Sequence, residues 1–209
     1  MQKTILYVHG MGGGGDSRIP SILKERLGPG FNVVVNTYSF DPEVASKQLA
    51  AWADEIRPDL VIGESMGATH AISLKGCPHL FVSPSLNAPH FFRALAFLAF
   101  IPGVTSFFDW YYHPKPGDRQ ELHFDSKTLL KWKKVRREAM KNTPLYGSRD
   151  KFHAFFGRHD HFRRSGVVKV STWKKYFGEG TWTVYDGTHF MEEEYIDSLL
   201  IPRILSELG

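Results

Sequence analysis

The chain has 209 residues, of which 42% are hydrophobic and 23% are charged, which suits one folded domain with a full core. Its single cysteine, Cys77, excludes an intrachain disulfide and a cysteine-rich zinc module. The net charge of +4 is too modest to indicate a nucleic-acid-binding protein.

The amino-terminal stretch MQKTILYVHG lacks the basic head, long apolar run and small-residue cleavage site of a signal peptide. The most apolar window, residues 91–104, contains Arg93 and Pro102 and is too short to cross a bilayer. We therefore expect a soluble, cytoplasmic protein with no membrane span.

Short apolar runs alternate along the chain with segments of helical period. The expected strands are residues 4–10, 31–39, 59–63, 79–85, 151–157 and 181–187. The expected helices are residues 17–27, 41–58, 66–76, about 165–177 and about 191–208, with Asp41 as a cap and Pro58 as a stop. Strands without polar alternation, separated by helices, indicate a parallel sheet covered on both faces. The predicted fold class is α/β.

The stretch from about 85 to 150 breaks this alternation and is rich in Phe, Trp, Tyr and Pro. A structureless connection of that length is uncommon in a compact domain, so we expect a helical cap inserted over the edge where the strands end. Residues 127–141 are its densest basic run, with Lys131, Lys133, Lys134, Arg136 and Arg137 expected to face water. A nucleic-acid surface is the alternative, but nearby acids favour a solvated helix face.

A glycine loop follows the first expected strand, and Gly10, Gly12 and Gly15 formally match the Gly-x-Gly-x-x-Gly pattern of dinucleotide-binding loops. Asp16 would place negative charge where a pyrophosphate should bind, and the next strand carries no acid at the ribose position. The favoured alternative is an oxyanion hole, in which the glycines allow close backbone approach. A turn without any ligand is the third explanation.

Three residues of catalytic type follow three separate strands. Ser65 stands in VIGESMG, Asp160 in RHDHFR and His189 in DGTHF. The carboxyl ends of parallel strands meet at one edge of a sheet, and the order Ser, Asp, His is that of nucleophile-elbow hydrolases. Taken singly, Ser65 and Asp160 could be helix caps and His189 a loop histidine.

Two other acids and one histidine-rich string offer alternatives to this set. Asp109 follows the previous strand and is the alternative acid, whereas Asp150 precedes its strand and should lie at the wrong edge. The string His-Asp-His at 159–161 lacks the cysteines or helical histidine pair of a metal site, so no metal is expected.

Together, YVHGMG, GESMG, FGRHD and DGTHF resemble the α/β-hydrolase superfamily, in particular its small single-domain serine esterases. The resemblance covers most of residues 4–83 and 151–205 and implies a mostly parallel sheet without the two leading strands of the full-length fold. It implies Ser65 as the nucleophile, His189 as the base, Asp160 as the orienting acid, and the backbone N–H groups of Met11 and Met66 as the oxyanion hole. No organic cofactor is implied.

The activity implied by the resemblance is hydrolysis of a small carboxylic ester or thioester. Amide hydrolysis, acyl transfer to an alcohol and a non-catalytic binding module remain alternatives. We expect His9 and Gly10 of the loop and Phe107 and Phe108 of the cap to contact substrate. The aromatic surface of the cap could instead complete the core or form a homodimer contact.

Overall fold

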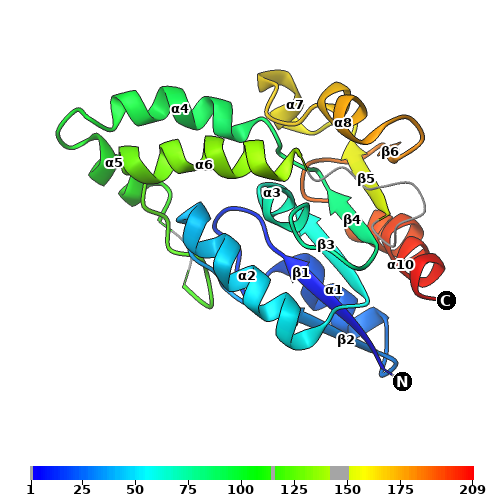
Figure 1. Ribbon diagram of the computed structural model, residues 1–209. Helices are drawn as coiled ribbons and strands as arrows, with labels where there is room; N and C mark the ends of the chain where they lie inside the picture. Colours follow the sequence, from blue (N-terminus) through cyan, green and yellow to red (C-terminus); the bar gives the residue numbers. More distant parts are fainter. Residues whose placement is uncertain (1, 114–115, 142–150) are drawn as a thin grey trace.

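The computed structural model describes residues 2–113, 116–141 and 151–209. In these residues six parallel strands form one sheet in the order β2-β1-β3-β4-β5-β6, as Figure 1 shows. The strands are β1 (Lys3–Val8), β2 (Phe31–Val35), β3 (Leu60–Glu64), β4 (His79–Val82), β5 (Phe152–Gly157) and β6 (Trp182–Tyr185). Gly63 near the end of β3 pairs with Val8 of β1 and Phe81 of β4, so these strands end together. The predicted parallel α/β sheet is confirmed.

Helices cover both faces of the sheet because side chains alternate between the faces along each strand. Ile5 and Tyr7 pack toward one face, whereas Leu6 and Val8 pack toward the other. The first face is covered by α1 (Arg18–Arg26) and by α9 (Glu193–Tyr195), η1 (Ile196–Leu200) and α10 (Ile201–Leu208). The second face is covered by α2 (Pro42–Ile56), α3 (Gly67–Ala71) and α8 (Val170–Phe177), with the short α7 (His161–Ser165) after β5.

The start of one predicted helix agrees with the structure, and the end of another does not. Asp41 caps α2 as expected, since its side chain accepts hydrogen bonds from the N–H groups of Glu43 and Val44. The helix predicted over residues 66–76 is shorter than expected and ends at Ala71. Beyond it the N–H of Ser73 bonds to the carbonyl of His70, three residues back, which is the tighter spacing of a 3₁₀ turn.

The helix predicted over residues 191–208 forms with one irregular turn. Residues Ile196–Leu200 adopt the wider π-helical spacing, and α10 follows with Pro202 in its first turn. Proline has no N–H to donate to the preceding turn, and a π-helical turn is one of the ways in which a helix accommodates such a gap.

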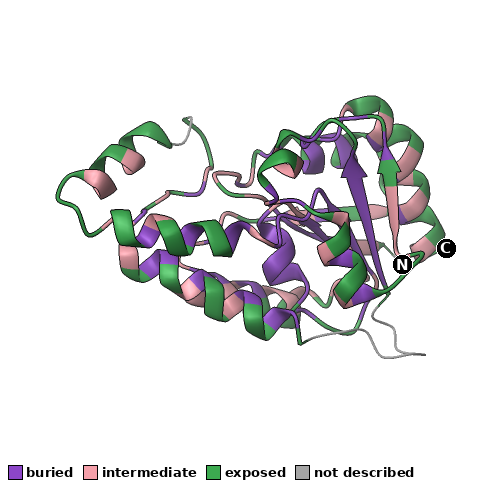
Figure 2. Ribbon diagram, turned by 90° about the horizontal axis from the view of Figure 1, so that it is seen from above, coloured by how far each residue is buried: buried purple, intermediate pink, exposed green. Residues whose placement is uncertain are grey.

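In the described part of the predicted cap, three helices lie between β4 and β5. They are α4 (Ala88–Leu98), α5 (Val104–Tyr111) and α6 (Ser126–Ala139). Helices α4 and α6 lie side by side over the carboxyl edge of the sheet, where Phe92, Trp132 and Phe124 form a cluster with Met66 of the body. Helix α5 buries none of its residues and stands at the far end of the cap, as Figure 2 shows. In the described part of the chain no helix has the length and apolar character needed to cross a membrane.

One residue of α6 corrects the sequence analysis. Arg136 was expected to face water, but it is buried, and its Nε donates a hydrogen bond to the carbonyl of Leu86. Its guanidinium also lies 5.8 Å from the centre of the Tyr176 ring. Helix α6 packs against α4, α2 and α3, so more than one of its faces is covered by other helices. The long aliphatic part of an arginine side chain can pack at such a covered face while its guanidinium forms hydrogen bonds.

Candidate active site

Ser65 occupies a sharp turn between β3 and α3. Its φ of 49° is in the left-handed region, which is costly for a residue with a side chain and persists only where neighbours fix it. Its N–H donates to the carbonyl of Val82, and its carbonyl accepts from the N–H of Ser85, both at 2.9 Å. A Cβ on Gly67 would lie 2.2 Å from the carbonyl oxygen of His9, so only glycine fits there. Ser65, held in this turn, lines a cavity.

A hydrogen-bonded relay joins Ser65 to two of the predicted partners. The Oγ of Ser65 lies 2.9 Å from Nε2 of His189, and Nδ1 of His189 lies 2.7 Å from Oδ2 of Asp160. The other Asp160 oxygen accepts from the N–H of Phe162 at 2.8 Å, which fixes the carboxylate. An ionised carboxylate can only accept, so Nδ1 of His189 carries the hydrogen and the Nε2 lone pair faces Ser65.

The alternative acid lies elsewhere. Asp109 accepts hydrogen bonds within the cap, from the N–H of Phe124 at 2.8 Å and with Nδ1 of His123 at 2.6 Å. It therefore has local partners of its own and makes no contact with His189 in the structure. Asp150, the other acid considered, lies outside the described residues.

Two backbone N–H groups are available beside the Ser65 hydroxyl. Met66 follows Ser65 at the start of α3, and Met11 follows Gly10 in the glycine loop. A Cβ on Gly10 would stand 3.1 Å from Cβ of Ser65, which shows how closely this loop approaches the serine. Neither the Met11 nor the Met66 N–H donates a hydrogen bond to another residue of the described chain. Met11 and Met66, the two expected oxyanion donors, thus lie in the two segments that adjoin Ser65.

The glycine loop is held by the segment that returns from the cap. A Cβ on Gly14 would lie 1.8 Å from the carbonyl oxygen of Asp118, so the loop and this segment touch backbone to backbone. Gln120 accepts from the N–H of Gly12 at 3.2 Å and donates its own N–H to the carbonyl of Gly13 at 2.6 Å. The space beside Gly14 and Gly15 is therefore filled by Asp118 of the chain itself, which argues against a nucleotide phosphate there.

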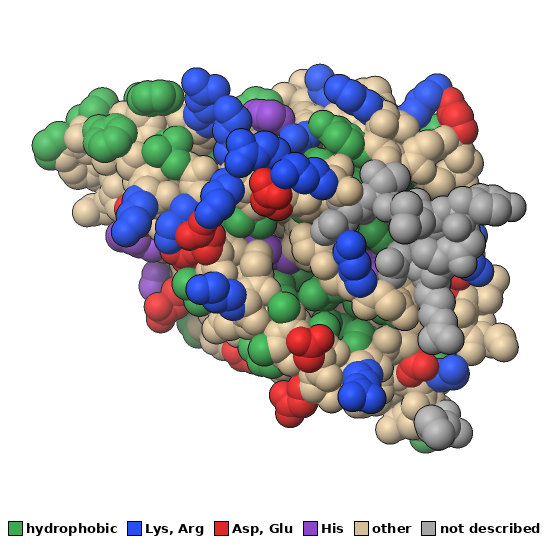
Figure 3. All heavy atoms as spheres, viewed as in Figure 1, with side chains coloured by type: hydrophobic (Ala, Val, Ile, Leu, Met, Phe, Trp, Pro, Cys, Tyr) green, Lys and Arg blue, Asp and Glu red, His purple; other side chains and the backbone are tan. Residues whose placement is uncertain are grey.

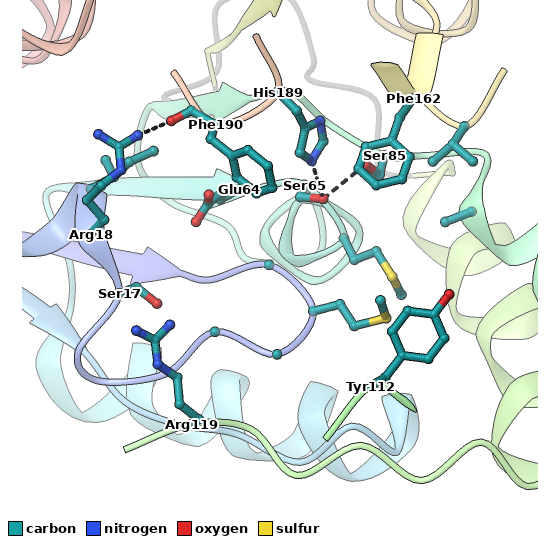
Figure 4. A pocket seen from close by; sticks show the side chains of 18 of the residues that line it. Ser17, Arg18, Glu64, Ser65, Ser85, Tyr112, Arg119, Phe162, His189 and Phe190 are labelled. Carbon is teal, nitrogen blue, oxygen red and sulfur yellow. Dashed lines mark hydrogen bonds between the residues drawn. The ribbon is translucent and has the colours of Figure 1, made fainter. Parts of the chain in front are cut away.

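Ser65 and His189 line a cavity of about 620 Å³. Figure 4 shows that different side chains lie on the two sides of Ser65. Tyr112 and Phe162 lie on one side of Ser65, which is mainly apolar. Arg18, Glu64 and Arg119 lie on the other side. The full apolar lining consists of Ile19, Ala88, Phe91, Phe92, Tyr112, Phe162, Val167 and Phe190 with Met11 and Met66.

Several polar side chains at the site were missed in the sequence, and two of them, Ser85 and Arg18, contact the relay or the loop that carries it. The Oγ of Ser85 lies 3.0 Å from Oγ of Ser65, and Ser85 could have been found because it follows β4 as Ser65 follows β3. Arg18 donates to the carbonyl of Met191 at 2.6 Å and to that of Phe190, and so holds the loop that carries His189. No local pattern in the sequence links Arg18 to this loop, since the contact joins residues 172 positions apart.

Three of the expected substrate contacts need correction. His9 is fully buried, its ring stacks on Tyr38 at 4.1 Å between centroids, and it does not line the cavity. Phe107 and Phe108 lie on α5, away from the cavity, where Phe107 is exposed and Phe108 packs beside Tyr112 and Phe124. Helix α5 lies at the far end of the cap, so neither ring lines the cavity. Gly10 does line the cavity.

The side chains of the His-Asp-His string diverge. His159 lies 2.9 Å from a carboxylate oxygen of Asp186 at the surface, Asp160 faces His189, and His161 packs on the ring of Phe162. Among residues 2–113, 116–141 and 151–209, no three His, Cys, Asp or Glu side chains gather as metal ligands would.

Two buried histidines beside the site predict how stability depends on pH. Burial lowers the pKa of His9 to about 4 and that of His70 to about 3, below the ordinary value near 6.5. Both histidines therefore bind protons more readily in the unfolded chain, and the free energy of unfolding falls as pH drops below about 6.5. Between pH 7 and 5 the expected loss is about 2 kcal/mol for each histidine, measured by urea unfolding.

His70→Gln supplies the control for this prediction. Glutamine does not titrate and can still reach Ser46, whose hydroxyl lies 3.2 Å from Nδ1 of His70. The variant should lose about 2 kcal/mol less than the wild type over the same pH interval. An identical loss in both proteins would show that His70 does not contribute.

Comparisons with known proteins agree with this fold. No protein-family model matches the chain, and no curated protein matches it in sequence. Among solved structures, a monoacylglycerol lipase from Paleococcus ferrophilus superposes with a TM-score of 0.65 at 16% identity, over 98% of this chain and 93% of that one. A structure of the metagenome-derived lipolytic enzymes LipS and LipT gives 0.61 at 16% identity, over 99% and 93% of the two chains. Est816, described as an N-acyl homoserine lactone degrading enzyme, gives 0.60 at 14% identity, over 100% and 94%.

Proposed function

With an α/β-hydrolase fold as the premise, we propose that this protein is a serine hydrolase that cleaves carboxylic esters or thioesters through an acyl-enzyme. The observation that supports the proposal is the relay from Ser65 through His189 to Asp160, with contacts of 2.9 and 2.7 Å, at the wall of a cavity of about 620 Å³. The solved structures with this fold include lipolytic enzymes, which is consistent with the proposal. Fold by itself does not assign a reaction, so the proposal depends on the site.

In the first half of the proposed reaction, Ser65 Oγ attacks the carbonyl carbon while its proton passes to Nε2 of His189. The carbonyl oxygen becomes an oxyanion, for which the N–H groups of Met11 and Met66 are the available donors. Asp160 stabilises the positive charge on the imidazolium without taking its proton. The tetrahedral intermediate then expels the alcohol or thiol, which receives the proton from His189, and the acyl group stays on Ser65.

In the second half, water enters in place of the leaving group. His189 removes a proton from the water, whose oxygen attacks the acyl carbon and forms a second oxyanion. Collapse of this intermediate releases the carboxylic acid and returns the proton from His189 to Ser65. No step requires a group that the chain itself lacks, apart from water.

The apolar side of the cavity predicts a preference for longer acyl chains. Each methylene that is buried there should contribute up to about 0.8 kcal/mol, or about fourfold in kcat/KM. We expect kcat/KM to rise from acetyl to at least hexanoyl in a series of p-nitrophenyl esters, with acyl thioesters tested alongside. A flat or falling series would contradict an acyl site on this side.

Phe91→Ala and Phe107→Ala form a matched pair for this test. Both phenylalanines are exposed, at 46% and 54%, but only Phe91 lines the cavity. Phe91→Ala should flatten the rise with chain length more than it lowers acetyl activity, whereas Phe107→Ala should leave the series unchanged. If Phe107→Ala flattened the series and Phe91→Ala did not, Phe107 would belong to the substrate site.

A further inference from the structure

The end of the cap carries an exposed apolar surface. Nine of the fifteen large apolar side chains that are exposed in the described chain fall within residues 91–112. They are Phe91, Phe97, Leu98, Phe100, Ile101, Phe107, Trp110, Tyr111 and Tyr112, which we call the apolar tip. Trp110 is 72% exposed and Phe100 is 70% exposed, so these rings gain nothing from the core of this chain. A contiguous apolar surface of this kind usually marks a docking site.

Positive charge lies beside the apolar tip. Figure 3 shows Lys and Arg side chains over α4 and α6, next to the hydrophobic side chains at the end of the cap. Residues 85–141 contain ten Lys or Arg and five Asp or Glu, a net charge of +5, whereas the whole chain carries +4. The rest of the chain therefore carries a net charge of −1. Within the described chain, Arg93, Lys127 and Lys133 are exposed and form no ion pair.

We propose that the apolar tip, with the cations beside it, docks on the surface of an anionic lipid membrane. Trp and Tyr rings with Phe and Leu, flanked by Lys and Arg, are the composition with which peripheral proteins enter the boundary between head groups and acyl chains. Each nearby Lys or Arg adds attraction to the negative surface. The rings of the tip would enter the boundary region while Arg93, Lys127 and Lys133 contact lipid head groups.

The positive charge of the cap favours an anionic membrane over a second copy of the chain as the partner of the apolar tip. A symmetric dimer through the apolar tip would bring the same surface of both copies together. The cations of one cap, with its net charge of +5, would then face those of the other, which opposes association. An anionic membrane presents the opposite charge to the same surface.

The apolar tip is continuous with the cavity at Ser65. Phe91 and Tyr112 belong to both, because each is exposed at the tip and each lines the cavity. A membrane-bound protein would thus have its cavity mouth beside the lipid surface. Docking itself does not rest on the proposed hydrolysis, and it can be measured on protein in which Ser65 is replaced.

Sedimentation with vesicles tests the proposal. The full chain carrying Ser65→Ala should bind vesicles of equal parts phosphatidylcholine and phosphatidylglycerol, more weakly at high salt, and should bind phosphatidylcholine alone much less. The double variant Phe100→Ala with Trp110→Ala should bind about tenfold more weakly for each ring removed. Arg93→Gln with Lys133→Gln should lose about fivefold for each cation removed, on anionic vesicles only. Leu205→Ala and Lys24→Gln, exposed on α10 and α1, serve as controls and should bind as the parent does.

Tryptophan fluorescence gives a second measurement. Trp110 should be quenched by lipids with brominated acyl chains, and Trp110→Phe should abolish most of the quenching while vesicle binding persists. Failure to bind anionic vesicles at low salt, or binding that survives both double variants, would overturn the proposal. So would a dimer in solution that the Phe100→Ala and Trp110→Ala changes dissociate without any vesicle binding. Unchanged hydrolysis of a soluble ester by the double variants, made with Ser65 intact, checks that they fold.

Discussion

Replacing Ser65 by alanine is expected to abolish covalent labelling by a fluorophosphonate probe and to reduce ester turnover by about 10⁶-fold. The reason is geometric: Ser65 Oγ is the hydroxyl that lies 2.9 Å from Nε2 of His189, next to two free N–H groups. An activated serine attacks phosphorus much as it attacks a carbonyl carbon. Intact-mass spectrometry and peptide mapping of the adduct measure the outcome directly.

Ser85→Ala is the matched control for this change. The Ser85 hydroxyl lies 3.0 Å from that of Ser65 but has no contact with His189 in the structure. This variant should still be labelled on Ser65, because the relay to His189 and Asp160 is intact. If the wild-type protein forms no adduct, the serine-hydrolase proposal is wrong. If an adduct persists in Ser65→Ala, a residue other than Ser65 is the nucleophile.

Asp160→Asn is expected to lower turnover by about 10⁴-fold with the fold retained. The asparagine oxygen can still accept from the N–H of Phe162 and cap α7, as Oδ1 of Asp160 does at 2.8 Å. Its amide would instead donate a hydrogen bond to Nδ1 of His189, which forces the hydrogen to Nε2 and removes the lone pair that should accept the Ser65 proton. The measurements are kcat for a soluble ester and the rate of probe labelling.

Asp109→Asn provides the comparison for this substitution. Among the described residues Asp109 is hydrogen-bonded within the cap, to Phe124 and His123, so its replacement should leave kcat close to that of the wild type. Urea unfolding of both variants separates loss of activity from loss of fold. If Asp109→Asn were the damaging change and Asp160→Asn were mild, the acid would be misassigned.

The sheet and the proximity of Ser65, His189 and Asp160 could be predicted because both follow from strand ends. In a parallel sheet each side chain just beyond a carboxyl end reaches the same edge, so Ser65, Asp160 and His189 were identified without knowledge of the strand order. The sharp turn at Ser65 was readable from Gly63 and Gly67, whose Cβ atoms would clash with Ala71 and with the carbonyl of His9. These features are local to single strands and the turns after them.

The cap could not be predicted in the same way. Helical period identifies an apolar stripe but not what covers it, so Arg136 was assigned to solvent although α6 is covered on several sides. The same ambiguity assigned Phe107 and Phe108 to the substrate, whereas Phe107 is exposed and Phe108 packs within the cap. His9 was misassigned because the loop motif fixes the backbone at Gly10 and Met11 and says nothing about the direction of the preceding ring, which turns to Tyr38.

The contact between the returning cap segment and the glycine loop limits how this scaffold can be re-engineered. Exchanging residues 85–150 for a cap from another protein would remove Gln120, which bonds to Gly12 and Gly13 and to the carbonyls of Tyr38 and Ser39. The ion pair between Arg119 and Asp16, at 2.6 Å, would be lost as well. The loop next to Met11 would then lack the hydrogen bonds and the ion pair that hold it. The Met11 N–H, which is proposed to bind the oxyanion, would lose its fixed direction. Here the cap is not an interchangeable module, and any graft has to carry the segment 116–120 with it.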